Sequence, residues 1–157
     1  RTGVRRETVS LAGVLAEIAR DLKGHLDALQ GTITICEGLP EVNGDLTLLR
    51  QIFTNLLENA VLYRRTDVHP EVGVTCQAEA DHVVVKVRDN GIGIPAEHHE
   101  KIFTIFQRLH SEEEYPGTGV GLATVKKAIE MLVGTVWVES TVGKGSVFSV
   151  KLPRERS

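Results

Sequence analysis

The sequence predicts a two-layer α/β sandwich, in which a mixed sheet of about five strands is covered on one face by three helices. Strand-like and helix-like stretches interleave without the regular strand–helix–strand repeat of a parallel sheet, and two pairs of neighbouring strands have the pattern of hairpins. The helix-like stretches each carry one apolar stripe, which needs a sheet face to cover. We therefore expect a single domain over residues 1–157.

The first half of the chain contains two strand patterns and two helix patterns. Residues 8–11 alternate like a short strand, and apolar side chains then recur at helical spacing from about residue 12 to 30. A β-branched run at 32–36 predicts a second strand, and Asn43 with Gly44 marks a turn after it. Asp45 is placed to cap the next helix, whose apolar stripe runs from Leu48 to Ala60.

The second half contains two hairpins on either side of a long polar segment. Residues 71–79 and 82–89 form the first hairpin, and residues 135–139 and 146–152 form the second, with a helix expected at 120–133. Residues 90–118 mix glycines, a proline and charges. Because this segment is long for a loop inside a compact domain, we interpret it as a lid over about 91–117.

Composition and charge limit the classes of function. Hydrophobic residues make up 41% and charged residues 25% of the chain, and the net charge is -3. This balance favours a soluble globular protein in the cytoplasm, with no nucleic-acid partner and no direct membrane contact. Cys36 and Cys76 both lie in strand-like stretches, so we expect reduced packing residues rather than a disulfide framework or a zinc site. The chain begins with Arg1, and Met131 is its only methionine, so we expect a piece of a longer protein.

The first chemical motif is a pair of amides on the predicted second helix. Asn55 and Asn59 are four residues apart, so both fall on one side of the helix at the edge of the apolar stripe. Mg²⁺ takes only one or two protein oxygens when phosphates and water supply the rest, so a neutral amide is sufficient. The alternative is two polar residues on a solvated helix face.

The second motif follows the strand at 82–89. Asp89 ends this strand and can accept a hydrogen bond from an exocyclic amine, while Gly91 and Gly93 let the backbone approach a flat ligand such as adenine. The alternative is an ordinary turn.

The third motif is a run of glycines that opens the helix at 120–133. Gly117, Thr118, Gly119, Gly121 and Leu122 place exposed amides and the positive end of a helix dipole where a phosphate can bind. The run lacks the lysine of a P-loop and the preceding strand of a dinucleotide fold, so both of those interpretations are excluded.

The fourth motif lies in the predicted lid. Phe103 and Phe106 are three residues apart and would share a helix face that anchors the lid, while Arg108 would reach a phosphate as a permanent cation. The alternative is ordinary packing.

In this order the four motifs resemble the N box, first glycine box, F box and second glycine box of histidine-kinase catalytic domains. These domains belong to the superfamily that includes gyrase, the heat-shock ATPase chaperones and the mismatch-repair ATPases. The resemblance runs from about Val9 to Pro153, and residues 106–110 and 114–119 are similar to the branch that contains bacteriophytochromes. It implies a Bergerat-type ATP-binding fold with an ATP lid.

The resemblance also implies a role for each matching residue. Asn59 would ligate Mg²⁺ beside Asn55, Asp89 would bind the adenine amine, and Tyr63 would lie against the adenine ring. Ser146 would support Asp89 through water, and Arg108 with the amides around Gly119 and Gly121 would hold phosphates. Many relatives carry a lysine where this chain has Leu62, and Arg64 or Arg65 are candidates to compensate.

The implied activity is that of a protein histidine kinase. Relatives that hydrolyse ATP place a glutamate where this chain has Asn55, and an amide cannot act as a general base for water. Glu58 could polarise an acceptor imidazole, although a solvated helix glutamate is the alternative. The implied partners are a dimerisation domain carrying the phosphoacceptor histidine, which together with a sensor domain is expected to be absent here, and a response regulator, with a homodimeric parent protein. The competing interpretations are a non-catalytic nucleotide-sensing or scaffold domain and an ATPase of the same superfamily.

Overall fold

The computed structural model describes residues 3–104 and 120–154. Its strands are β1 (Glu7–Ser10), β2 (Thr32–Ile35), β3 (Glu41–Gly44), β4 (Glu71–Ala78), β5 (His82–Asp89), β6 (Thr135–Thr141) and β7 (Gly145–Pro153). Its α-helices are α1 (Leu11–Ala28), α2 (Leu46–Leu62) and α3 (Val120–Met131), and two short 3₁₀ helices are η1 (Ala96–His98) and η2 (Lys101–Phe103).

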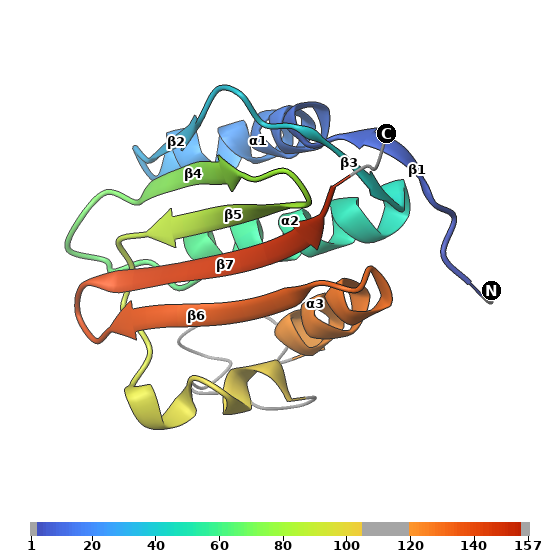
Figure 1. Cartoon of the computed structure of the whole chain (residues 1–157). Helices are drawn as coiled ribbons and strands as arrows, with labels where there is room; N and C mark the ends of the chain where they lie inside the picture. The colour runs from blue at the N-terminus through green and yellow to red at the C-terminus, as the bar shows by residue number, and fades with distance from the viewer. Residues whose placement is uncertain (1–2, 105–119, 155–157) are drawn as a thin grey trace.

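The main sheet has five strands in the order β2-β4-β5-β7-β6 (Figure 1). β2 and β4 are parallel and are joined by a connection that contains β3 and α2, and the other three pairs are antiparallel. The sheet is therefore mixed, and the two predicted hairpins are confirmed as β4–β5 and β6–β7.

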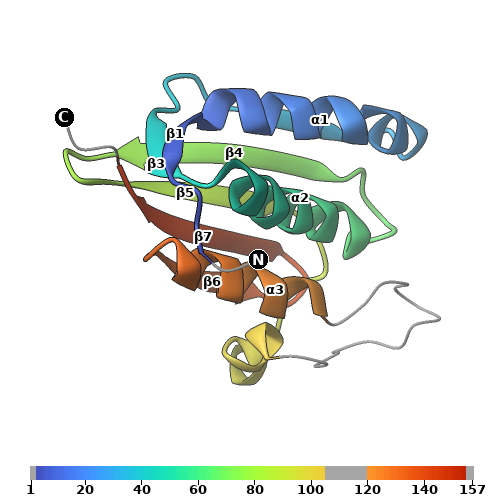
Figure 2. The same cartoon turned by 90° about the vertical axis from the view of Figure 1, so that its right-hand side faces the viewer.

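The three α-helices lie side by side on one face of this sheet (Figure 2). The core between the layers includes Phe53 and Leu56 of α2, Val85 of β5 and Val150 of β7, all with 0% exposure. Burial of these apolar side chains is what holds the helix layer on the sheet. The predicted two-layer sandwich of five strands and three helices is confirmed.

Side-chain caps fix where two of the helices begin. The Ser10 hydroxyl accepts a hydrogen bond from the amide of Gly13 at 3.1 Å and starts α1. The predicted cap Asp45 starts α2, with Oδ1 accepting from the amide of Leu48 at 3.1 Å and Oδ2 accepting from the amide of Arg5 at 2.9 Å. Asp45 thus also holds the N-terminal segment against the body.

The expected turn at Asn43 and Gly44 is wrong. These residues belong to β3, which pairs antiparallel with β1 in a separate two-stranded sheet, with Glu7 opposite Gly44. The glycine is needed because a Cβ at Gly44 would lie 2.9 Å from the Leu49 side chain. Packing against the first turn of α2 therefore explains a glycine whose local pattern is typical of a turn.

No helix within the described ranges is long and apolar enough to cross a membrane.

Candidate nucleotide-binding site

Asp89 ends β5 with its carboxylate held by two backbone amides. Its Oδ1 accepts hydrogen bonds from the amide of Gly91 at 2.9 Å and from the amide of Ser146 at 3.2 Å. Burial raises the pKa of Asp89 to about 6, although the two amides act in the opposite direction. Because both of these bonds converge on Oδ1, Oδ2 is the oxygen placed to accept a hydrogen bond from a ligand.

The glycines after Asp89 let the loop pass between two parts of the fold. A Cβ at Gly91 would lie 2.4 Å from the carbonyl oxygen of Tyr63, and the amide of Ile92 donates to that same oxygen at 3.0 Å. Gly93 has a φ of +77°, and a Cβ there would lie 2.2 Å from the carbonyl oxygen of Thr141. The loop is therefore clamped between the end of α2 and the β6–β7 hairpin, as only glycine allows.

Ser140 links this loop to the residues around Asp89. Its hydroxyl lies 2.8 Å from each of three groups, namely the amide of Ile94, the carbonyl of Gly145 and the hydroxyl of Ser146. The single proton of Ser140 must go to the carbonyl, so the Ile94 amide and the Ser146 hydroxyl both donate to Ser140. The Ser146 oxygen is left as an acceptor, beside the Asp89 carboxylate that its own amide contacts.

Residues that were predicted to hold magnesium and phosphate lie on α2 and at the start of α3. Figure 2 shows that α2 ends and α3 begins on the same side of the molecule. A Cβ on Gly121 would lie 3.9 Å from Oδ1 of Asn55, so the predicted amide face of α2 meets the first turn of α3. Asn55 and Asn59 are half-buried, Glu58 is exposed, and Leu122 packs against the core.

This arrangement fits a magnesium ion that is held mainly by phosphate. Within residues 3–104 and 120–154, no three histidine, cysteine, aspartate or glutamate side chains come together as a metal site. Asn55 brings a neutral amide oxygen to the α2–α3 contact, and Asn59 lies four residues further along α2. Mg²⁺ accepts so few protein ligands only where substrate phosphates and water complete its shell.

The described start of the predicted lid, residues 91–104, is anchored to the body. Ile102 is 5% exposed, and the ring of Phe103 meets Phe148 of β7 edge to face, with centroids 6.1 Å apart. Nε2 of His99 lies 2.8 Å from the carbonyl oxygen of Ile94. Phe103 therefore packs against the sheet, while its expected role as the anchor of a lid stays a prediction. The predicted residues Phe106, Arg108, Gly117, Thr118 and Gly119 lie outside the described part of the chain.

Two further residues, Asn90 and Arg65, support the loop after Asp89, and Asn90 was not identified as a site residue from the sequence. Asn90 donates through Nδ2 to the carbonyl of His69 at 3.0 Å and accepts through Oδ1 from the amide of Glu71 at 2.9 Å, which fastens the segment after α2 onto β5. Arg65 donates through Nε to the carbonyl of Asn90 at 3.0 Å. Of the two arginines considered as substitutes for the missing lysine, Arg65 is thus the one that binds the loop after Asp89.

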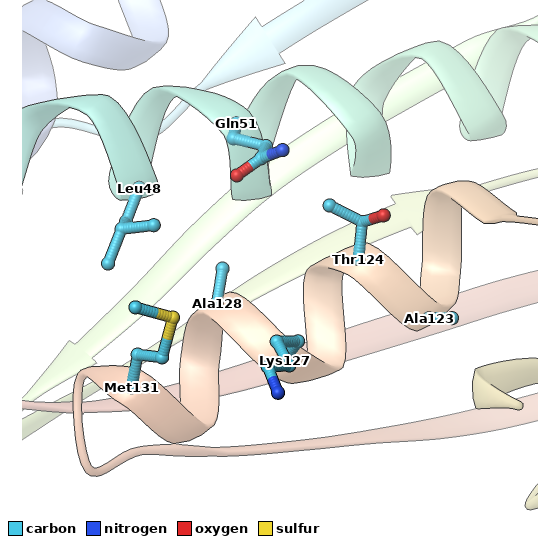
Figure 3. A pocket seen from close by; sticks show the side chains of 7 residues that line it. All are labelled: Leu48, Gln51, Ala123, Thr124, Lys127, Ala128 and Met131. Carbon is cyan, nitrogen blue, oxygen red and sulfur yellow. The ribbon is translucent and has the colours of Figure 1, made fainter. Parts of the chain in front are cut away.

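A separate apolar cavity of about 210 Å³ opens between the start of α2 and α3 (Figure 3). It is lined by Leu48, Gln51, Ala123, Thr124, Lys127, Ala128 and Met131. None of the predicted nucleotide-binding residues lines it. The candidate site therefore rests on two contacts, between Asp89 and Ser146 and between Asn55 and Gly121, and not on this cavity.

Comparison with known proteins identifies a family and several relatives by sequence. Residues 44–156 match the family model described as histidine kinase-, DNA gyrase B- and HSP90-like ATPase. The chain is 39% identical over 159 residues to cyanobacterial phytochrome A of Nostoc sp., covering 96% of this chain and 21% of that protein. It is 35% identical to the methanogenesis regulatory histidine kinase FilI of Methanothrix harundinacea, over 94% of this chain and 16% of FilI.

A solved structure shares the fold. The crystal structure of full-length ShkA in complex with AMPPNP superposes with a TM-score of 0.85 at 25% identity, over 99% of this chain and 32% of ShkA. The chain thus spans about a fifth of the length of the first of these relatives and less than a third of ShkA.

Proposed function

The chain belongs to the family of histidine kinase-, DNA gyrase B- and HSP90-like ATPases, and on this basis we propose that it binds Mg-ATP and transfers the γ-phosphate to a histidine on a dimerisation domain. One observation carries the proposal. The face of α2 that bears Asn55 meets the first turn of α3 at Gly121, and this contact lies at the same end of the molecule as the loop after Asp89 (Figure 2).

The adenine end supports a base with an exocyclic amine. Asp89 offers Oδ2 and Ser146 offers its hydroxyl oxygen, and both are acceptors once Ser140 has fixed the direction of its hydrogen bonds. An amine donates two protons, so it satisfies such a pair directly or through water. A base with a carbonyl oxygen at this position would place acceptor against acceptor.

The phosphate end supports phosphoryl transfer rather than hydrolysis. Asn55 lies against the first turn of α3, where a phosphate chain would meet the positive end of the helix dipole. Asn59 would ligate Mg²⁺, which when bound would supply positive charge against the phosphate oxygens. Asn55 carries an amide where a hydrolytic relative would need a carboxylate, so no general base faces water at this position.

The remaining assignments belong to the same proposal. Tyr63 would lie against the adenine ring, Arg108 with Gly117, Thr118 and Gly119 would hold phosphates, and Glu58 would polarise the acceptor imidazole. FilI is named as a histidine kinase, which favours a kinase over the other activities in the family. We further propose a cytoplasmic, homodimeric parent protein and a response regulator as the downstream partner.

The test supplies an acceptor and follows the phosphate. The chain is mixed with labelled ATP, with and without the dimerisation domain of a related histidine kinase, and both protein-bound and free phosphate are measured. Acid-labile phosphate on the added domain supports the proposal. Free phosphate without protein label indicates an ATPase, and bound nucleotide with neither product indicates a sensing or scaffold domain, so either result contradicts it. Asp89→Asn is the control: because it should bind nucleotide about tenfold more weakly, it should give less label than the wild type when ATP is limiting.

A further inference from the structure

Two thiols come into contact at the edge of the main sheet. Sγ of Cys36 lies 3.5 Å from Sγ of Cys76, and both residues are half-buried, free cysteines. A disulfide bond is about 2.0 Å long, so the sulfur atoms have only about 1.5 Å left to close. These are the only cysteines of the chain.

The backbone explains why the two side chains meet. Cys36 directly follows β2, and its amide still donates to the carbonyl of Val74 on β4 at 2.9 Å. Because β2 ends at Ile35, the Cys36 side chain need not follow the alternating in-and-out pattern of the strand, and it turns toward Cys76. Cys76 packs against the core, which holds its thiol in place.

The pair is separate from the candidate nucleotide site. Asp89 pairs with Val72, at the opposite end of β4 from Cys76. Four residues along a strand correspond to about 13 Å, so a bond at Cys76 leaves the Asp89 carboxylate and its two amide donors in place.

We propose that Cys36 and Cys76 form a modification site, at which a small-molecule disulfide of the glutathione class oxidises the two thiols to a reversible intrachain disulfide. One thiolate attacks the small disulfide and releases one small thiolate, giving a mixed disulfide. The second cysteine then attacks the protein-bound sulfur of this mixed disulfide and releases the other small thiolate. Two electrons pass from the cysteines to the small disulfide, which leaves as two thiols carrying the two protons.

The environment makes this reaction slow at neutral pH. Burial, followed by the hydrogen bond to Cys76, raises the pKa of Cys36 to about 11, so the reactive thiolate of Cys36 is scarce. The disulfide between Cys36 and Cys76 therefore forms under sustained oxidising conditions and not under brief ones. Its formation should speed up as the pH rises.

The bond would close a loop that contains β3 and the whole of α2, including Asn55 and Asn59. A cross-link of this span restricts the unfolded chain far more than the folded one, in which the sulfur atoms are already in contact. We expect the oxidised domain to melt about 5–10 °C higher than the reduced domain. ADP affinity should change by less than about twofold, because the nucleotide site is left in place.

The experiment equilibrates the folded chain with oxidised glutathione at pH 8 and measures mass, a peptide map without reductant, melting temperature and ADP affinity. The expected result is a loss of two hydrogens, one linked peptide pair containing Cys36 and Cys76, and the higher melting temperature, all reversed by dithiothreitol. Cys36→Ser and Cys76→Ser should each give only a mixed disulfide and no rise in melting temperature.

Three outcomes would overturn the inference. They are glutathione on either cysteine of the wild-type chain without a cross-link, no reaction after prolonged oxidation, and a cross-link that lowers the melting temperature or forms only in urea. Because kinase activity is not read out, failure of the proposed function and failure of this site are independent of each other.

Discussion

The carboxylate of Asp89 is ionised at neutral pH in surroundings that favour its neutral form. Burial raises its pKa to about 6, against about 4 for an exposed aspartate, and the amides of Gly91 and Ser146 recover only part of the lost hydration. A carboxyl group whose pKa is higher in the folded than in the unfolded state lowers the free energy of unfolding, and this effect is largest above the folded-state pKa, where the group is ionised. The site therefore keeps an acceptor for an amine at the expense of stability.

Asp89→Asn should consequently make the nucleotide-free domain more stable at pH 8, by up to about 2–3 kcal/mol. The asparagine Oδ1 can keep both amide hydrogen bonds without the buried charge. As the pH falls through 6 toward 4, wild-type Asp89 becomes protonated and the advantage of the variant should disappear. Urea unfolding of both proteins at several pH values measures this difference, and a variant that is less stable at pH 8 would contradict the assigned environment of Asp89.

The same substitution should remove a pH-dependent part of nucleotide affinity. An amine donates to an ionised carboxylate, so wild-type affinity for ADP should rise as the pH increases through about 6 and then level off. Losing this charged hydrogen bond in Asp89→Asn should weaken ADP binding about tenfold at pH 8. Calorimetry at pH 5.5 and pH 8 tests both statements. At each pH the phosphates of ADP have the same charge in the experiments with the two proteins. The ratio of the wild-type and variant affinities therefore reports the ionisation of Asp89 alone.

Ser140→Ala should weaken discrimination between bases. Without Ser140, the Ser146 hydroxyl is free to rotate and to donate, so it can serve a base with a carbonyl oxygen as well as one with an amine. The preference for ADP over inosine diphosphate should fall about fivefold, which corresponds to one hydrogen bond.

Ser149→Ala is the matched control for this prediction. Ser149 is fully buried on β7, and within the described part of the chain its hydroxyl has no hydrogen-bond partner. Its removal should leave base preference unchanged, and Ser140→Thr, which keeps the hydroxyl, should do the same. A loss of stability in Ser140→Ala without a change in preference would reduce Ser140 to a structural role.

Single residues differed in how far the sequence could identify them. Asp89, Gly91 and Gly93 follow a clear strand, and Asn55 with Asn59 follows helical periodicity, so their positions could be inferred from local pattern. Ser140, Asn90 and Arg65 act through hydrogen bonds to residues 5 to 46 positions away. Their partners depend on the register of strands and loops, which local composition does not contain.

At the scale of an element, the proposed function needs the first turn of α3 to stay open for a phosphate. A Cβ on Gly121 would project toward Asn55 without any clash, since its nearest neighbour is 3.9 Å away. Gly121→Ala should therefore fold at least as well as the wild type, because alanine favours a helix by about 1 kcal/mol. ATP affinity should nevertheless fall about tenfold, because the added methyl group occupies the space between α2 and α3.

Gly24→Ala in α1 gives the comparison for this variant. A Cβ on Gly24 meets nothing within 4 Å, so the substitution should raise the melting temperature and leave ATP affinity unaltered. If both variants bind ATP like the wild type, the phosphate does not lie against the first turn of α3.

The elements themselves were predictable to the extent that their patterns are local. The apolar stripe of α2 and the alternation of β4 and β5 each describe one buried face, and the predicted bounds agree with the structure to within one or two residues. β3 was missed because its four residues Glu41–Gly44 read as a turn and become a strand only by pairing with β1. Two short strands that are 30 residues apart in the chain stabilise each other by pairing, so neither has a clear strand pattern in its own sequence.

At the scale of the whole molecule, four histidines of the described part of the chain lie at the surface or in local hydrogen bonds. His82 lies 2.7 Å from the carboxylate of Asp81, and the Nε2 of His99 lies 2.8 Å from a backbone carbonyl. His25 is exposed in the last turn of α1, and His69 is exposed in the segment before β4. These four histidines therefore have an ordinary structural or surface character.

The isolated chain should therefore bind Mg-ATP and yet acquire no phosphate on itself. Added dimerisation helices should become labelled slowly and at a rate that depends on the concentrations of both pieces, because separate molecules lack the high effective concentration that a covalent tether provides. Varying the concentration of the added domain under constant ATP gives this dependence directly. A rate that is independent of the added domain, or stoichiometric phosphate on His98, His99 or His110 of the chain alone, would place the acceptor within this domain and contradict the proposed transfer to a separate one.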